Sequence, residues 1–255
     1  MLPANPDPSP GFESLRGQAH VWFARPEDFR NEVELARYRT WLSDEERARA
    51  DRYLSADDRH LFLVAHALLR STLSRYGRRR PEEWQFTTGE HGRPELIGES
   101  VAATRPGFSL SHTHGLVACL VSDEVDCGVD VEGRGRVADP RGLAARYFSR
   151  AERDALDALP DTQVDTRFLE YWTLKEAYVK ARGLGLELPL DGFRFTFEGR
   201  RPIGVVFGAR IPDQAQRWQF EQCRPGPGHV LAVAVRRGGG GIRKVVVRRA
   251  LPEVL

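Results

Sequence analysis

Two stretches of the chain carry apolar residues at steps of three and four positions, a spacing that places them on one face of a helix. The first runs from Asp57 to Tyr76 and the second from Asp165 to Arg182. We therefore predict two long helices, ended by Gly77 and Gly183, because glycine commonly terminates helices. The apolar positions are Leu61, Val64, Ala65, Leu68, Leu69 and Leu73 in the first helix and Phe168, Leu169, Trp172, Ala177 and Val179 in the second.

Local signals indicate further elements. The sequence Ser43-Asp44-Glu45-Glu46 has the S-x-x-E arrangement of a helix start, and it precedes an arginine-rich segment. Another helical region is expected over residues 140–159. Strands are expected where short apolar runs lie between turn residues. These runs are 20–24, the surroundings of Phe108 and Leu110, and then 116–121, 128–132, 193–197, 204–207, 218–222 and 230–235.

The order of helices followed by strands occurs twice, which predicts the α+β class and a chain of two parts. We place the boundary near residues 122–126, giving an N-terminal half of residues 18–123 and a C-terminal half of residues 124–237. Residues 1–17 are rich in Pro, Gly and Ser and are expected to be a mobile leader. Residues 238–255 begin with a glycine run and continue as a basic tail, which either adds an edge strand or stays loose.

Composition narrows the class of protein. The 255 residues are 41% hydrophobic, enough for one large core or two modest ones. Lys plus Arg (38) nearly balance Asp plus Glu (36), so no overall charge selects a nucleic acid or a membrane as partner. The apolar runs are far shorter than the roughly 20 residues that span a bilayer, and no signal-peptide pattern is present. A cytoplasmic location and reduced, unpaired cysteines are expected.

Two carboxylates alternate along one predicted strand. In Gly128-Val129-Asp130-Val131-Glu132, Asp130 and Glu132 stand at positions i and i+2, so both side chains point to the same face. Two like charges on one face call for a cation. An ordinary solvated strand face would show the same alternation, and this alternative stays open at this point.

The second long helix carries a third carboxylate. Glu176 and Lys180 stand one turn apart, a spacing that usually means a simple surface ion pair. Beside a strand with two more carboxylates, however, Glu176 would complete the oxygen-rich environment that Mg²⁺ prefers, and Lys180 would hold phosphate groups.

The segment Phe108-Ser109-Leu110-Ser111-His112 ends a strand with hydroxyl groups and a histidine, which suits hydrogen bonds to phosphate. Ser111 beside His112 also suggests a nucleophile and its base. Neighbours on a strand point to opposite faces, and no G-x-S-x-G motif surrounds them, so a serine hydrolase is disfavoured.

Four motifs in this order resemble the Sfp-type 4′-phosphopantetheinyl transferases: G-R-P at 92–94, F-S-L-S-H at 108–112, G-V-D-V-E at 128–132 and W-T-L-K-E-A-Y-V-K at 172–180. The resemblance covers about residues 20–237. It implies two similar α/β halves related by a pseudo-twofold axis, with the active site in the cleft between them. It also implies transfer of the phosphopantetheine arm of coenzyme A to a serine of an apo acyl or peptidyl carrier protein, with release of adenosine 3′,5′-bisphosphate.

By the same resemblance, Asp130, Glu132 and Glu176 would ligate Mg²⁺, or Mn²⁺ in its place. Glu176 would also act as the base for the serine proton, directly or through a water, and Lys180 would hold the pyrophosphate. Glu152 has the position of a helix cap. The residues expected to contact coenzyme A are Arg49, Arg93, Pro94, Ser111, His112, Lys175 and Lys180.

Other readings remain in competition. A module that binds a nucleotide without transferring anything would use the same cleft, but its acidic triad need not be intact. A nucleic-acid interaction would rest on Arg78-Arg79-Arg80 and the basic tail, which lack interleaved aromatic residues. The expected partners are therefore coenzyme A and a carrier protein, with no nucleic acid and no membrane, and the chain is expected to be a monomer.

Overall fold

The computed structural model describes residues 11–89, 91–97, 106–197, 199, 202–238 and 241–251. Elements of the N-terminal part are β1 (Gln18–Ala24), α1 (Glu32–Trp41), α2 (Asp44–Asp51), α3 (Ala56–Tyr76), β2 (Phe86–Thr88), β3 (Pro94–Leu96), β4 (Gly107–Thr113) and β5 (Leu116–Ser122). Those of the C-terminal part are β6 (Cys127–Gly133), α5 (Pro140–Tyr147), α6 (Arg150–Asp157), α7 (Asp161–Arg182), β7 (Phe193–Thr196), β8 (Gly204–Phe207), β9 (Trp218–Cys223), β10 (His229–Arg236) and β11 (Lys244–Arg249).

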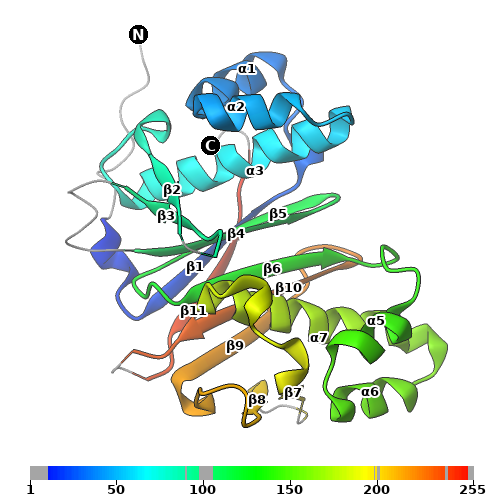
Figure 1. The fold of residues 1–255 in the computed structure, drawn as a ribbon. Helices are drawn as coiled ribbons and strands as arrows, with labels where there is room; N and C mark the ends of the chain where they lie inside the picture. Colours follow the sequence, from blue (N-terminus) through cyan, green and yellow to red (C-terminus); the bar gives the residue numbers. More distant parts are fainter. Residues whose placement is uncertain are drawn as a thin grey trace.

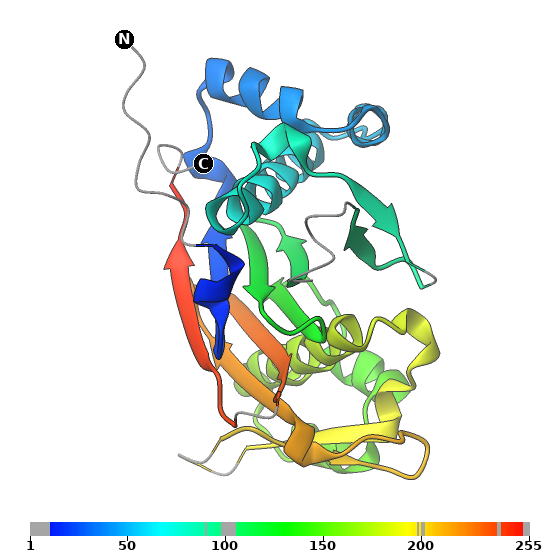
Figure 2. The ribbon, with the colours of Figure 1, turned by 90° about the vertical axis from the view of Figure 1, so that its left-hand side faces the viewer.

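The two parts repeat one topology. In the first, β1 is followed by α3 and the β4–β5 hairpin, and the strands lie in the order β1-β5-β4. In the second, β6 is followed by α7 and the β9–β10 hairpin, in the order β6-β10-β9. Figures 1 and 2 show α1–α3 on one side of the molecule, α5–α7 on the other and the main sheets between them. The predicted α+β class with two similar halves is confirmed.

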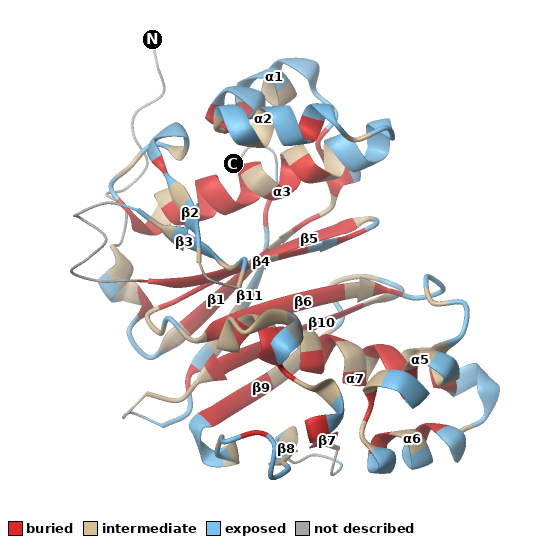
Figure 3. Cartoon of the chain, viewed as in Figure 1, coloured by how far each residue is buried: buried red, intermediate tan, exposed pale blue. Residues whose placement is uncertain are grey.

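Three apolar clusters fill the space between these layers. One lies between α3 and the first sheet, one between α7 and the second sheet, and one combines residues of β1, β5, β6 and β10 between the sheets. Alternate residues of β5 belong to different clusters, so this strand is buried on both faces, as Figure 3 shows. Burial on two faces explains why β5 is a continuous apolar run in the sequence.

Both chain ends return to the first sheet. β11 pairs in parallel with β1, so the basic tail adds an edge strand. Just before β11, Arg243 donates to Asp123 and, at 2.6 Å, to Glu124 in the connection between the halves. Residues 1–10 of the expected leader lie outside the described residues, as do 239–240 and 252–255. Leu15 in the remaining part of that leader is fully buried against the N-terminal half.

No helix in the described part of the chain combines the length and the apolar character needed to cross a bilayer.

Helix α1 has no counterpart among the predicted helices. Asn31 caps it by accepting the N–H groups of Val33 and Glu34. Tyr38 and Trp41, three positions apart, are its buried residues. Leu35, three residues before Tyr38, packs against the same core, so the apolar side of α1 is a short run at three-residue steps among polar residues.

The predicted helix start at Ser43 is confirmed and also fastens α2 to α3. Glu46 Oε2 accepts the Ser43 N–H at 2.8 Å, and the Ser43 hydroxyl accepts the Glu46 N–H at 3.2 Å. The same carboxylate pairs with Arg70 at 2.6 Å and His66 at 2.9 Å on α3. Partial burial alone would raise the pKa of Glu46, but the hydrogen bond from His66 and the charges of His66 and Arg70 lower this pKa to about 2.

A line of hydroxyl groups joins the two halves. The Ser109 hydroxyl of β4 accepts the Val129 N–H of β6 at 3.1 Å, and the Ser111 hydroxyl accepts the Val131 N–H at 3.3 Å. Side chains of β4 therefore take the place of main-chain acceptors along the edge of β6 that does not face β10. We call this contact the hydroxyl seam.

Gly128 allows α7 to lie directly on β6. A methyl group at this position would overlap the Ala177 carbonyl oxygen and lie 2.6 Å from the Ala181 nitrogen, both in the α7 backbone. The glycine of the G-V-D-V-E motif is therefore a packing requirement, and it sets the distance between the acidic strand and the helix that carries Glu176.

Gly128→Ala is expected to lower Tm, because β6 and α7 must separate to admit the methyl group, at a cost of about 1–3 kcal/mol. Gly133→Ala is the matched control. A methyl group at this other end of β6 meets ring atoms of His229 at 3.6 Å and the Arg136 side chain at 3.8 Å, which are ordinary contacts. Thermal unfolding of both variants gives the comparison, and equal Tm values would contradict the close approach of the helix.

Glu46→Gln should remove a pH-dependent part of the stability. The pKa of Glu46 falls from 4.5 to about 2 on folding, so the ionised carboxylate stabilises the protein above pH 4.5, and this contribution is lost as the pH falls towards 2. Its full size is up to about 3 kcal/mol. Urea denaturation should show the difference in free energy of unfolding between wild type and variant shrinking from about pH 5 to about pH 3. A difference independent of pH would rule out this role.

Candidate active site

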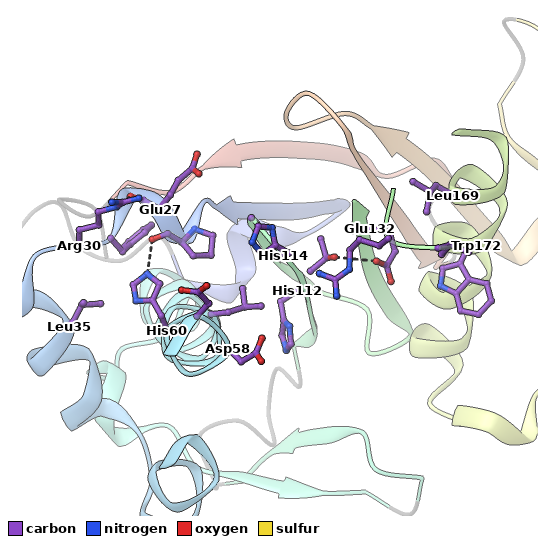
Figure 4. A pocket seen from close by; sticks show the side chains of 18 of the residues that line it. Glu27, Arg30, Leu35, Asp58, His60, His112, His114, Glu132, Leu169 and Trp172 are labelled. Atoms are coloured by element: carbon purple, nitrogen blue, oxygen red, sulfur yellow. Dashed lines mark hydrogen bonds between the residues drawn. The ribbon is translucent and has the colours of Figure 1, made fainter. Parts of the chain in front are cut away.

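Two pockets lie where the halves meet. The larger, of about 950 Å³, has residues of α1 and α3 on one side and residues of α5 and α7 on the other. Figure 4 shows Trp172 on the α7 side and His112 and Glu132 between the two walls. The smaller, of about 510 Å³, is lined by Arg93, Pro94, Glu176 and Lys180 among others. Six of the predicted site residues thus line the contact between the halves from two directions, whereas Arg49, Ser111, Asp130 and Lys175 line neither pocket.

Asp130 is the most enclosed of the predicted metal ligands, with 4% of its surface exposed. Its Oδ1 accepts hydrogen bonds from the Ser111 hydroxyl at 2.8 Å and from the Lys180 ammonium group at 2.7 Å. Its Oδ2 is buried and has no hydrogen-bond partner among the described residues. A buried carboxylate oxygen without a donor is costly, so this atom is suited to an additional positive ligand.

The three carboxylates act on one another. Burial and then the charge of Asp130 raise the pKa of Glu176 to about 7; Lys180 opposes this shift and Glu132 adds to it. Burial and the charge of Asp130 also raise the pKa of Glu132, although Glu132 accepts a hydrogen bond from Thr113 at 3.3 Å. Glu132 and Glu176 are therefore harder to ionise than exposed carboxylates, first because they are buried and then because Asp130 lies nearby.

Within the described residues, no three His, Cys, Asp or Glu side chains are already arranged as a metal site. Lys180 is the cation that the structure places on Asp130, rather than on Glu176 one turn before it. The donor set nevertheless fits a hard divalent cation, because it consists of carboxylate oxygens and includes the unpartnered Oδ2 of Asp130.

His112 and Ser111 point in opposite directions, as neighbours on a strand should. Ser111 is buried and bonded to Asp130 and Lys180, whereas His112 is exposed in the larger pocket. No nucleophile–base pair forms between them. Limited hydration and the positive charges of Lys180, His66 and Arg49 lower the pKa of His112. Arg49 therefore lies close enough to act on His112, and this neighbourhood favours an anion.

Arg93 and Pro94 lie at the tip of the β2–β3 hairpin, in the wall of the smaller pocket. Arg93 donates to the main-chain carbonyl oxygens of Val125 and, at 3.2 Å, of Ala181. The hairpin of one half is thereby tied to the end of α7 in the other, next to Glu176 and Lys180.

The prediction that Lys175 contacts the cofactor is not supported. Its side chain is fully buried within the C-terminal core, where its ammonium group pairs with Glu152 at 2.9 Å. It also donates to the carbonyl oxygens of Leu190 and Phe193, each at 2.7 Å. Glu152 forms the expected capping box with Ser149 as well. Lys175 therefore has a structural role, because its ammonium group is bound by Glu152 and two main-chain carbonyl oxygens inside the core.

Several lining residues carry no local sequence signal. Asp58 and His60 reach the larger pocket from the start of α3, and Arg146 and Tyr147 reach the smaller pocket from the end of α5. Each belongs to an ordinary amphipathic helix and becomes a site residue only because the halves face each other. Local sequence patterns do not specify how the halves are placed relative to each other. These residues are therefore identified as part of the site only in the structure.

Comparison with known families matches most of the chain, from residue 29 to residue 234. Residues 29–125 match the model described as "4′-phosphopantetheinyl transferase, N-terminal", and residues 126–234 match the "4′-phosphopantetheinyl transferase superfamily". The two matches meet between residues 125 and 126, in the connection between β5 and β6.

Curated relatives cover similar lengths. The 4′-phosphopantetheinyl transferase HetI of Nostoc sp. is 32% identical over 89% of this chain and 91% of its own length. The transferase Sfp of Bacillus subtilis is 27% identical over 80% and 86%. The mouse L-aminoadipate-semialdehyde dehydrogenase-phosphopantetheinyl transferase is 24% identical over 78% and 68%. These matches confirm the resemblance to the Sfp-type enzymes, and the chain belongs to the 4′-phosphopantetheinyl transferase superfamily.

Proposed function

We propose that this chain, acting as a cytoplasmic monomer, transfers the 4′-phosphopantetheine arm of coenzyme A to a serine of an apo acyl or peptidyl carrier protein. In this reaction the serine oxygen bonds to the β-phosphorus, and the bond from that phosphorus to the bridging oxygen breaks. Adenosine 3′,5′-bisphosphate leaves, and the serine proton passes to a base. The family membership supports the transfer, and the site geometry supports the assignment of residues.

The observation that carries the assignment is the unpartnered Oδ2 of Asp130 amid three mutually repelling carboxylates. We assign Asp130, Glu132 and Glu176 as the residues that would hold Mg²⁺. The cation would neutralise the pyrophosphate while negative charge moves onto the leaving bisphosphate. Mn²⁺ has the same preference for oxygen ligands and is the natural substitute.

Lys180 has two roles in this proposal. Without other ligands its ammonium group balances Asp130 and is held between Asp130 and the Ser111 hydroxyl, at 2.7 and 2.9 Å. Once another positive charge compensates Asp130, Lys180 is available to the pyrophosphate. Its side chain is about one-third exposed, which leaves it room to turn.

Glu176 is assigned first as a ligand and second as the base. A pKa of about 7 suits proton transfer near neutral pH. Ligation of a cation favours the ionised form of Glu176 and lowers that pKa again, which makes it a weaker base. In this proposal Glu176 accepts the serine proton either directly or through a water. Because burial and the neighbouring carboxylates raise its pKa to about 7, the protonation state of Glu176 depends on whether a cation binds beside it.

For coenzyme A itself, we assign Arg49 and His112 to phosphate groups, because Arg49 and Lys180 place positive charge around His112 and the imidazole can donate a hydrogen bond there. Arg93 and Pro94 are assigned to the adenine region through the smaller pocket. Ser111 is assigned a positioning role on Asp130 and Lys180, with its hydroxyl already committed to both.

Asp130→Asn is expected to abolish transfer with little change in fold, because the amide keeps the volume and an acceptor for Ser111 but lacks the charge that a cation needs. Incubation with coenzyme A, Mg²⁺ and apo carrier proteins, followed by mass spectrometry, measures transfer as a gain of ~340 Da on the carrier. The control is Asp154→Asn on α6, an exposed carboxylate outside both pockets.

Near wild-type transfer by Asp130→Asn would refute the metal assignment. A wild-type protein that binds coenzyme A but never adds mass to any carrier would favour the binding-module alternative instead.

A further inference from the structure

The mouth of the larger pocket carries negative charge on one side. Glu32 in the first turn of α1 and Asp57 and Asp58 in the first turn of α3 line it, and all three are exposed. Acidic residues in these turns stabilise their helices through the helix dipole. Because both helices begin at this pocket, the same residues also give it an acidic wall. Arg30 lines the pocket beside Glu32 and is a positive side chain within this wall.

Positive charge gathers on an adjoining side. A pocket of about 430 Å³, here called the basic pocket, is lined by Arg25, His114, Arg134, Arg136 and His229, with the carboxylate of Glu27 beside Arg25. These residues come from the loops that follow β1, β4 and β6 and from the first position of β10. The basic pocket shares His114 and Arg136 with the larger pocket, so the two are continuous.

The arginines of the basic pocket keep most of their charge available. Arg25 lies 3.9 Å from Glu27, and Arg134 lies 3.6 Å from Asp165, both long ion pairs at partly exposed positions. Such pairs bind weakly and are easily exchanged for a better partner. Arg134 is also held in place by its main-chain N–H, which donates to the Gly228 carbonyl oxygen at 2.7 Å.

The wall opposite the acidic residues is apolar. Val137, Leu143 and Trp172 of the C-terminal half line it, each partly exposed. In Figure 4, Trp172 and Leu169 face the residues of α1 and α3 across the pocket. The entrance therefore has an acidic side, a basic side and an apolar side around His112 and Glu132.

We propose that this entrance docks the acceptor protein in one orientation, by matching a surface of opposite polarity. The acceptor would present carboxylates to the basic pocket, Lys or Arg side chains to Glu32, Asp57 and Asp58, and an apolar strip to the wall around Trp172. This inference rests on the proposed function, since it describes the protein that supplies the serine. A surface with one sign of charge would be attracted on one side and repelled on the other, so the arrangement selects polarity as well as charge.

Two double variants test the proposal through the kinetics of the apo carrier protein that the wild type modifies fastest. Arg25→Gln/Arg134→Gln weakens the basic side, and Arg136 stays intact because its charge acts on Glu132. Asp57→Asn/Asp58→Asn weakens the acidic side. The control variants, Arg150→Gln/Arg194→Gln and Asp154→Asn/Asp157→Asn, change the net charge equally at exposed positions outside the larger, smaller and basic pockets.

Both test variants should lower kcat/KM for the carrier by about three- to tenfold at low salt, because each removes one half of the electrostatic match. The loss should shrink in high salt, while KM for coenzyme A stays close to wild type and both controls behave as wild type. Tm should stay close to wild type for the arginine variant and fall by only a few degrees for the aspartate variant, because Asp57 and Asp58 also stabilise the first turn of α3.

A rise in kcat/KM for Asp57→Asn/Asp58→Asn, with a fall for the arginine variant, would mean a uniformly acidic acceptor and would overturn the proposal. So would wild-type kinetics for both test variants. If the wild type itself modifies no carrier protein, the proposed function fails, and this inference fails with it.

Discussion

β4 and β6 come from different halves of the molecule and meet along a line where serine hydroxyls receive the amide N–H groups of Val129 and Val131. In this hydroxyl seam, serine side chains replace the main-chain carbonyl groups that would accept these N–H groups in a sheet. Unlike a carbonyl group, each hydroxyl can also donate a hydrogen bond. The Ser111 hydroxyl uses it to donate to Asp130 and to accept from Lys180. The contact that joins the halves is therefore also the contact that orients the charged groups of the site.

Two other features depend on the same geometry. Gly128 brings α7 against β6, so that Glu176 and Lys180 reach the carboxylates of the strand. Arg93 crosses from the β2–β3 hairpin to carbonyl oxygens on the other half and holds the second wall in place. With the carboxylates fixed in partly buried positions, their mutual repulsion cannot relax by moving apart. A bound cation would relieve it, and the buried, unpartnered oxygen of Asp130 offers a place for such a charge.

Much of this site could be predicted from the sequence, because its chemistry follows local periodicity. Alternation along a strand put Asp130 and Glu132 on one face, and the same rule separated Ser111 from His112. The spacing of α7 also places Lys175 on the buried side of the helix. Phe168, Tyr171, Leu174 and Tyr178 mark the buried face, and Lys175 is seven residues from Phe168, on that same face. A lysine is tolerated there because Glu152 and two carbonyl oxygens, all distant in sequence, surround its ammonium group.

What the sequence could not supply was the contact between the halves. The hydroxyl seam pairs residues twenty positions apart through side chains, and the acidic and basic sides of the entrance come from loops and helix starts spread over both parts. Helix α1 was not predicted because its core-facing residues, Leu35, Tyr38 and Trp41, form only a short apolar pattern among polar residues. These features depend on how the two halves are oriented relative to each other. Local sequence propensity predicts the elements of each half but not this orientation.

The central claim is that the carboxylates of β6 and α7 bind one divalent cation together with coenzyme A. Titration of the wild-type protein with Mn²⁺, followed by electron paramagnetic resonance of the free ion, counts this cation directly. The account predicts one bound Mn²⁺ per chain when coenzyme A is present. A protein that transfers phosphopantetheine to a carrier while binding no Mn²⁺ under the same conditions would contradict it.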